Sequence, residues 1–137
     1  MKILNLLFIT MLCSSCATQR SAEKAAVYAR PSSFIAAQVI LDKSNASEHD
    51  VAKLKKVSES LLALSQNITG DITREEMIEI VVGNEPSNGK WVVFGSYIYD
   101  IYFSKISTDK VKNTSLVITE IAKGVLDAVS LRTFASK

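Results

Sequence analysis

The chain has 137 residues, of which 47% are hydrophobic and 22% charged, and its formal net charge is +2. These values are ordinary for a globular domain, and nothing in them indicates the clustered positive charge expected of a nucleic-acid-binding protein. With one histidine and two cysteines, the chain has no disulfide framework, so its fold must depend on a hydrophobic core.

The first sixteen residues have the layout of an export signal. Lys2 supplies a positive charge, residues 3–12 form an apolar run interrupted by Asn5 and Thr10, and small residues follow. This is the pattern of a secretory signal peptide. The run is well short of the roughly 20 residues that span a bilayer, so we expect no permanent transmembrane helix here.

The end of this segment, Ser14-Ser15-Cys16, resembles the lipobox of bacterial lipoproteins. In that class, small residues precede a cysteine that is diacylated on its sulphur and becomes the N-terminus after cleavage. The resemblance implies that Cys16 is lipidated, that residues 1–15 are a signal peptide and that fatty acyl groups such as palmitate hold the protein at a membrane. Cys13 departs from the class, which usually has an aliphatic residue there. Ala17, in the position that influences sorting, implies the outer membrane if the host is Gram-negative.

Two other interpretations of this segment are open. Ser15-Cys16-Ala17 also fits a small-x-small cleavage site, which would release a soluble secreted protein beginning near Thr18. The spacing of Cys13 and Cys16 matches a C-x-x-C redox pair, but that motif needs a βαβ context that the sequence does not show. We favour the lipoprotein interpretation.

The remaining chain has room for one domain. We assign residues 16–31 to the lipidated N-terminus and a polar, Ala-rich tether, and residues 32–137 to a helical domain. Pro31 is expected to end any helix that precedes it. Residues 34–41 are apolar on nearly all sides, which predicts either a buried helix capped by Ser32 or Ser33, or a strand.

A clear amphipathic helix is predicted from Ser47, which can serve as its N-cap and is followed by acidic residues. We expect it to end near Gly70. Lys53 lies on its predicted polar side. The apolar face consists of Val51, Leu54, Val57, Leu61, Leu64 and Ile68.

Thr73 and Glu76 form a capping box that predicts a short helix as far as Gly83. Residues 84–89 are then rich in turn-forming residues.

Residues 91–106 are the most aromatic part of the chain, and by propensity alone they favour a strand. In a strand, alternate residues face opposite sides, but here such alternation does not place the polar residues on one side and the apolar residues on the other. On a helical wheel, however, Ser96, Asp100 and Ser104 gather in a narrow arc with Val93 and Tyr97. We therefore predict a central, mostly buried helix.

A last helix is predicted from about Thr114. Gly124 lies on its apolar face, which predicts the close approach of a neighbouring helix, in our interpretation the aromatic one. The predicted fold class is all-α, a single-domain bundle of about four to five helices. The apolar face of this last helix consists of Val117, Ile118, Ile121, Val125, Ala128 and Val129.

Residues able to support catalysis or bind a metal are scarce. His49 is the only histidine, and we expect it to be exposed in the first turn of a helix rather than part of a triad. Glu75, Glu76 and Glu79 fit a solvated helix face better than a metal site. No glycine-rich phosphate loop is present. We therefore predict no catalytic, cofactor-binding or metal-binding residue and no enzymatic activity.

The aromatic segment has a structural and a functional interpretation. Its rings could pack in the core, the commoner role, or form a stacking platform or membrane-facing belt. A pocket lined by Tyr97, Tyr99 or Tyr102 would favour ligand binding. The residues concerned are Trp91, Tyr97, Tyr99, Tyr102 and Phe103.

Two functional hypotheses follow from the sequence. The first is an exported envelope lipoprotein, anchored through acylated Cys16, whose non-enzymatic helical domain binds an envelope protein. The alternative is a soluble secreted or periplasmic protein, either a small-ligand binder or an enzyme whose acidic residues cannot be recognised in one sequence.

Overall fold

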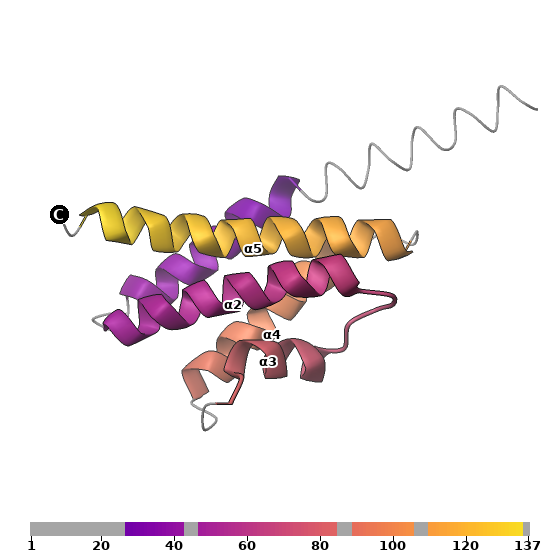
Figure 1. Cartoon of the computed structure of the whole chain (residues 1–137), viewed down its shortest axis with the longest axis horizontal. Helices are drawn as coiled ribbons and strands as arrows, with labels where there is room; N and C mark the ends of the chain where they lie inside the picture. The colour runs from indigo at the N-terminus through magenta and orange to yellow at the C-terminus, as the bar shows by residue number, and fades with distance from the viewer. Residues whose placement is uncertain (1–26, 43–46, 85–88, 106–109, 136–137) are drawn as a thin grey trace, which may run out of the picture.

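The computed structural model describes residues 27–42, 47–84, 89–105 and 110–135, and within these ranges the only regular structure is α-helix. Residues 27–42, which we call the N-terminal helix, are followed by α2 (Glu48–Asn67), α3 (Arg74–Val82), α4 (Gly89–Lys105) and α5 (Lys110–Ala135) (Figure 1). This confirms the predicted small all-α domain.

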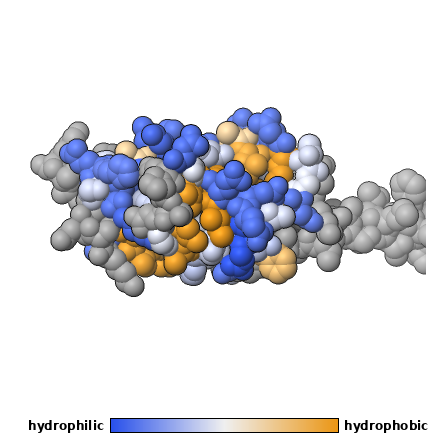
Figure 2. Space-filling model, turned by 90° about the horizontal axis from the view of Figure 1, so that it is seen from below, coloured by the Kyte–Doolittle hydropathy of each residue, from blue (hydrophilic) through white to orange (hydrophobic). Residues whose placement is uncertain are grey.

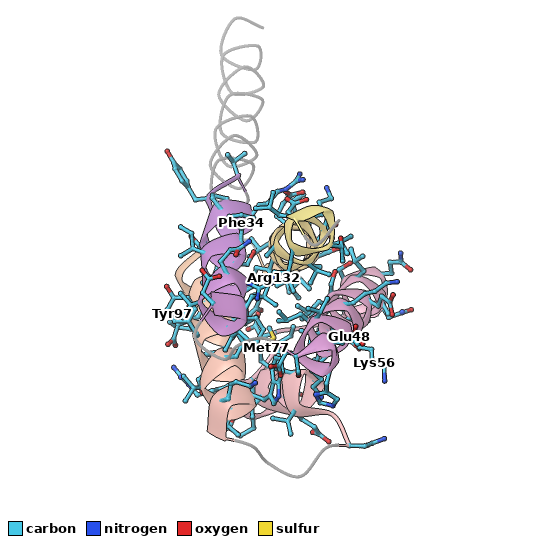
Figure 3. All side chains as sticks on the ribbon, turned by 90° about the vertical axis from the view of Figure 1, so that its left-hand side faces the viewer. Phe34, Glu48, Lys56, Met77, Tyr97 and Arg132 are labelled. Carbon is cyan, nitrogen blue, oxygen red and sulfur yellow. The ribbon has the colours of Figure 1, made fainter. Side chains whose placement is uncertain are left out.

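The helices form two groups around one core. α2 and α5 pack along each other, and α3 packs mainly against α4. Figures 1 and 3 show the N-terminal helix and α4 side by side, on the same side of the α2–α5 pair. The largest side chains that are fully buried between the helices are Trp91, Tyr102, Leu41, Leu54, Leu61, Met77, Ile98, Ile118 and Ile121.

The N-terminal helix runs through Pro31, so the prediction that this proline ends a helix is wrong. Residues 27–31, which we assigned to the tether, therefore belong to this helix, and Ala29 is fully buried. Proline removes one backbone hydrogen bond and disfavours a helix interior by about 3 kcal/mol. Packing offsets this cost here, because the face that contains Ala29, Ala37 and Leu41 lies in the core. The same finding settles residues 34–41 as helix rather than strand.

α2 begins as predicted. The Ser47 side chain accepts a hydrogen bond from the Asp50 backbone N–H, and Leu54, Val57 and Leu61 are buried. The helix ends at Asn67, before the predicted end near Gly70. Lys53, expected on the polar side, is 7% exposed, because its ammonium group reaches the end of α3 and donates to the Val82 carbonyl oxygen.

The predicted capping box of α3 is present. Thr73 accepts from the Glu76 backbone N–H at 3.2 Å, and the Glu76 carboxylate accepts from the Thr73 backbone N–H at 2.7 Å. Gly83 ends the helix with a φ of 61°, a conformation that glycine adopts without steric cost. Its N–H donates to the Glu79 carbonyl oxygen at 2.7 Å.

The aromatic segment is a helix, as predicted. In α4, Trp91, Phe94, Ile98 and Tyr102 are buried. Val93, Tyr97 and Asp100 are exposed together, which agrees with the narrow arc seen on the helical wheel.

α5 begins at Lys110, earlier than the predicted start near Thr114, and its predicted apolar face is buried. Gly124 does lie at a close helix contact, but the partner is the N-terminal helix rather than α4. A Cβ atom at Gly124 would lie 2.1 Å from the Arg30 carbonyl oxygen and 2.1 Å from Ser33 Oγ. The expected partner was wrong because the sequence pattern assigned Arg30 to a tether.

Candidate functional site

Surface hollows lie along the contact between α2 and α3. α3 packs mainly against α4, where Gly95 permits a close approach: a Cβ at that position would lie 2.9 Å from Ile78 Cα. Two hollows lie along the contact between α2 and α3, which we call the α2–α3 seam, and Ile80 lines both of them.

The larger hollow has a volume of about 600 Å³. The end of α2, the connection that follows it and α3 form its walls. Leu64, Ile68 and Ile80, all half-buried, supply apolar surface. Every charged residue that lines it is acidic: Asp71, Glu76 and Glu79. This end of the seam therefore presents negative charge beside apolar surface.

The smaller hollow has a volume of about 290 Å³ and lies toward the C-terminal end of α3. Lys53 and Lys56 are the charged residues that line it, together with Ser60, Gly83 and Asn84. The seam thus runs from an acidic end to a basic end, with Ile80 between them. Seen from below, the surface of the domain carries hydrophobic residues among hydrophilic ones (Figure 2).

Each charged end of the seam is held in place by local contacts. The hydrogen bond from the Thr73 backbone N–H is the main cause that lowers the pKa of Glu76, so the capping box favours the ionised form of this carboxylate and fixes its position. At the other end, Lys53 is fixed by its bond to the Val82 carbonyl oxygen.

A buried ion pair supports the basic end. Asp50 Oδ1 lies 2.7 Å from Lys90 Nζ, and Asp50 is only 6% exposed. The ammonium groups of Lys53 and Lys90 lie 5.8 Å and 5.1 Å from the centre of the Trp91 ring. The cation–π contact of Lys53 and the Asp50–Lys90 ion pair both link α2 to the first turn of α4.

Of the residues singled out in the sequence, Glu76 and Glu79 both line the larger hollow of the seam. Cys16 and Cys13 lie outside the described residues. His49 is exposed at the start of α2, and Glu75 is exposed on α3 without lining either hollow. Among the described residues no group of three or more histidine, cysteine or acidic side chains is arranged to hold a metal ion.

The tyrosines of α4 do not line either hollow. Tyr102 is buried, and its hydroxyl oxygen lies 3.4 Å from the Ile72 backbone nitrogen, which donates to it. Tyr99 stacks on Phe103 with ring centres 5.8 Å apart, while the Arg74 guanidinium lies 4.9 Å from its centre. These tyrosines therefore contribute nothing to the two hollows of the seam.

Sequence reasoning missed the seam because its signals were ambiguous. Ile80 fits an apolar helix pattern and looked like an ordinary core residue, and Lys53 looked like a solvated one. Only the pairing of α2 with α3 shows that the two side chains border the same surface.

The chain matches no protein-family model, no curated protein and no solved structure. None of the described helices is long and apolar enough to cross a membrane.

Proposed function

We propose that the protein is a bacterial envelope lipoprotein, anchored through acylated Cys16, whose helical domain binds a protein partner at the α2–α3 seam. The single observation that supports a binding domain is the seam itself, with half-buried Ile80 between an acidic and a basic end. A helix or extended segment with an apolar side chain between a basic and an acidic residue would complement it. Ser14-Ser15-Cys16 supports the anchor.

The anchor has a direct physical consequence. Each buried methylene contributes about 0.8 kcal/mol, so two or more acyl chains give stable attachment. A domain held at a membrane searches a surface instead of a volume, and its affinity for an envelope partner can be modest. This suits a shallow recognition surface with one central apolar residue.

The anchor is tested by the variant Cys16→Ala and by intact-mass analysis of the mature N-terminus. We expect the wild-type protein to begin at an acylated Cys16 and to fractionate with membranes, and the variant to be released from them. A wild-type N-terminus downstream of Cys16, or a variant that stays in the membrane fraction, contradicts the anchor.

The seam is tested by two matched pairs of charge reversals. Glu79→Lys and Lys56→Glu alter residues that line the hollows, whereas Glu75→Lys and Lys55→Glu make the same change on exposed positions of the same helices that do not line them. After crosslinking in intact cells, we expect Glu79→Lys and Lys56→Glu to capture several-fold less partner than the wild type. The matched controls, Glu75→Lys and Lys55→Glu, should capture as much as the wild type. Equal capture by both members of each pair contradicts the seam as the binding surface.

The same pairs separate a protein partner from a small ligand. The larger hollow lies within the size range of ligand pockets, roughly 300–1,000 Å³, and its acidic residues would select a cationic molecule. Such a ligand would be sensitive to Glu79→Lys and insensitive to Lys56→Glu. A protein partner that spans the seam responds to both.

A further inference from the structure

One outer face of the domain is apolar although it is open to solvent. It is formed by Tyr28, Ile35 and Val39 of the N-terminal helix and by Val93 and Tyr97 of α4, and we call it the apolar face. These side chains are between 44% and 68% exposed. The two helices lie side by side, and Figure 3 shows Tyr97 pointing outward, away from α2 and α5.

Helical spacing gathers these residues into one surface. Positions 28, 35 and 39 fall on one side of the N-terminal helix, opposite buried Ala37 and Leu41. Positions 93 and 97 are one turn apart on α4. The apolar face therefore extends across two neighbouring helices instead of consisting of scattered single residues.

The charged residues that border the apolar face are paired with residues on other elements. Arg30 Nε lies 2.7 Å from Asp127 Oδ2 on α5, and Asp100 pairs with Arg74 on α3. Lys90 is paired with Asp50 on α2. Between Pro31 and Val39 the sequence of the N-terminal helix contains no charged residue. The five side chains of the face carry no charge, and each of these charges beside them is compensated by an ion-pair partner.

We propose that the apolar face lies on the surface of the bilayer that carries the anchor, with its side chains at the boundary between headgroups and acyl chains. This inference rests on the proposed acylation of Cys16. Only ten residues, 17–26, separate Cys16 from Val27. At 3.3–3.6 Å per residue they span at most about 40 Å, which keeps the domain close to the membrane. The face begins at Tyr28, at the end of the helix that the tether enters.

The size of the face favours a bilayer over a second copy of the chain. A stable protein interface uses about 20–30 residues on each side, far more than the five of this face. A membrane contact can be weaker, because the acyl chains already hold the domain in place. Tyr28 and Tyr97 also suit the interface, where tyrosine is enriched because its ring is apolar and its hydroxyl polar.

This placement orients the candidate binding site. Glu48 and Lys56 of α2 lie on the side of the domain away from Tyr97 (Figure 3). With the apolar face on the bilayer, α2 is therefore turned toward the surrounding space. The contact is also expected to be insensitive to anionic lipid and to salt, since neither acts on an uncharged surface.

The test uses single-cysteine variants of the full chain, expressed so that it is processed, and reconstituted in phosphatidylcholine vesicles. Ile35→Cys and Val93→Cys place a thiol on the apolar face, and Lys56→Cys places the control thiol on exposed α2. In acylated protein the Cys16 sulphur is blocked, so the introduced thiol alone takes a bimane fluorophore. We expect spin-labelled lipids to quench the labels at 35 and 93 several-fold more than the label at 56, with no change on adding phosphatidylglycerol or salt.

Each other result has a defined meaning. Equal quenching at all three positions, with acylation of Cys16 confirmed by mass, overturns the membrane-facing role and leaves the anchor intact. Absence of acyl groups overturns both proposals. The labels at positions 35 and 93 can also be quenched with iodide in detergent micelles. If their protection from iodide increases with protein concentration, a second copy of the chain occupies the face, and the bilayer contact is overturned.

Discussion

Replacing Gly124 with alanine tests the contact that holds the N-terminal helix against α5. The added Cβ would lie 2.1 Å from the Arg30 carbonyl oxygen. Cβ contacts below 3.0 Å are essentially never seen, so one of the two helices must move by about 1 Å. Ser33 Oγ, equally close, can rotate away, but the backbone carbonyl cannot.

Two opposing effects set the size of the change in stability. Alanine favours a helix interior over glycine by about 1 kcal/mol. Overpacking usually costs 1–3 kcal/mol, and contact with a backbone atom puts this site at or above the upper end. Displacement also loosens Ala29 and Ala37, which are fully buried along the same helix. We expect Gly124→Ala to lower the free energy of unfolding by about 2 kcal/mol.

Two other glycines provide a graded control. Gly89, the first residue of α4, has no atom within 4 Å of its would-be Cβ, and at Gly95 the nearest is Ile78 Cα at 2.9 Å. Gly89→Ala should leave stability unchanged or raise it by a few tenths of a kcal/mol. Gly95→Ala should fall between, at a loss of up to about 1 kcal/mol, because the helix gain opposes a smaller clash.

Urea unfolding followed by circular dichroism measures these differences as shifts of the midpoint at a constant slope. The expected order of stability is Gly89→Ala, then Gly95→Ala, then Gly124→Ala. If Gly124→Ala is as stable as the wild type, the N-terminal helix does not pack on α5 as described, and the reasoning fails.

Two further predictions concern charged residues. Lys90→Met removes the ion pair between Lys90 and buried Asp50 and should cost about 1–3 kcal/mol, less than for a fully buried pair because the Lys90 side chain is 27% exposed. Urea unfolding measures this cost, and an unchanged midpoint would show that the pair contributes nothing. The capping hydrogen bond from Thr73 lowers the pKa of Glu76 in the folded state, so its contribution to stability is present above the ordinary glutamate pKa of about 4.3 and is lost as the pH falls through the folded value. Glu76→Gln should therefore be less stable than the wild type at neutral pH and nearly as stable as it in acid. The control Glu75→Gln, at an exposed neighbouring position, should show a smaller loss of stability at neutral pH. A loss of stability in Glu76→Gln that persists in acid would contradict the link to ionisation.

The features that could be predicted from the sequence are those decided within a few residues. The cap of α2 at Ser47 and the capping box of Thr73 and Glu76 need only the first turn of a helix, so the residue types and spacing suffice. The hydrophobic pattern of α5 repeats over several turns, and Val117, Ile121 and Val125 are all buried as expected. Local periodicity likewise outweighed strand propensity in the aromatic helix.

Three of the wrong expectations, at Pro31, Lys53 and Gly124, depend on partners distant in the sequence. Pro31 lies inside a helix because that helix packs in the core, a gain that local rules do not include. Lys53 is buried because the end of α3, some thirty residues later, offers it a carbonyl oxygen, at Val82. Gly124 predicted a close contact correctly, but its partner near Arg30 lies almost a hundred residues earlier in the chain.

The candidate site divides in the same way. The motif at Cys16 is local and can be recognised from sixteen residues. The α2–α3 seam could not be predicted from the sequence, because Ile80, Glu79 and Lys56 each fit the ordinary pattern of an amphipathic helix. Their arrangement as an acidic end, an apolar centre and a basic end exists only once the two helices are paired.

The two proposed surfaces depend on different helix contacts, so an experiment can separate them. The apolar face spans the N-terminal helix and α4, so its continuity requires the contact at Gly124 that positions the first of these helices. The seam depends on α2 and α3, and α3 is held by α4 through Gly95. Gly124→Ala should therefore reduce lipid quenching at position 35 more than at position 93, while capture of the partner through Glu79 and Lys56 continues. Loss of both activities in a folded Gly124→Ala protein would mean that the two surfaces are coupled through the core.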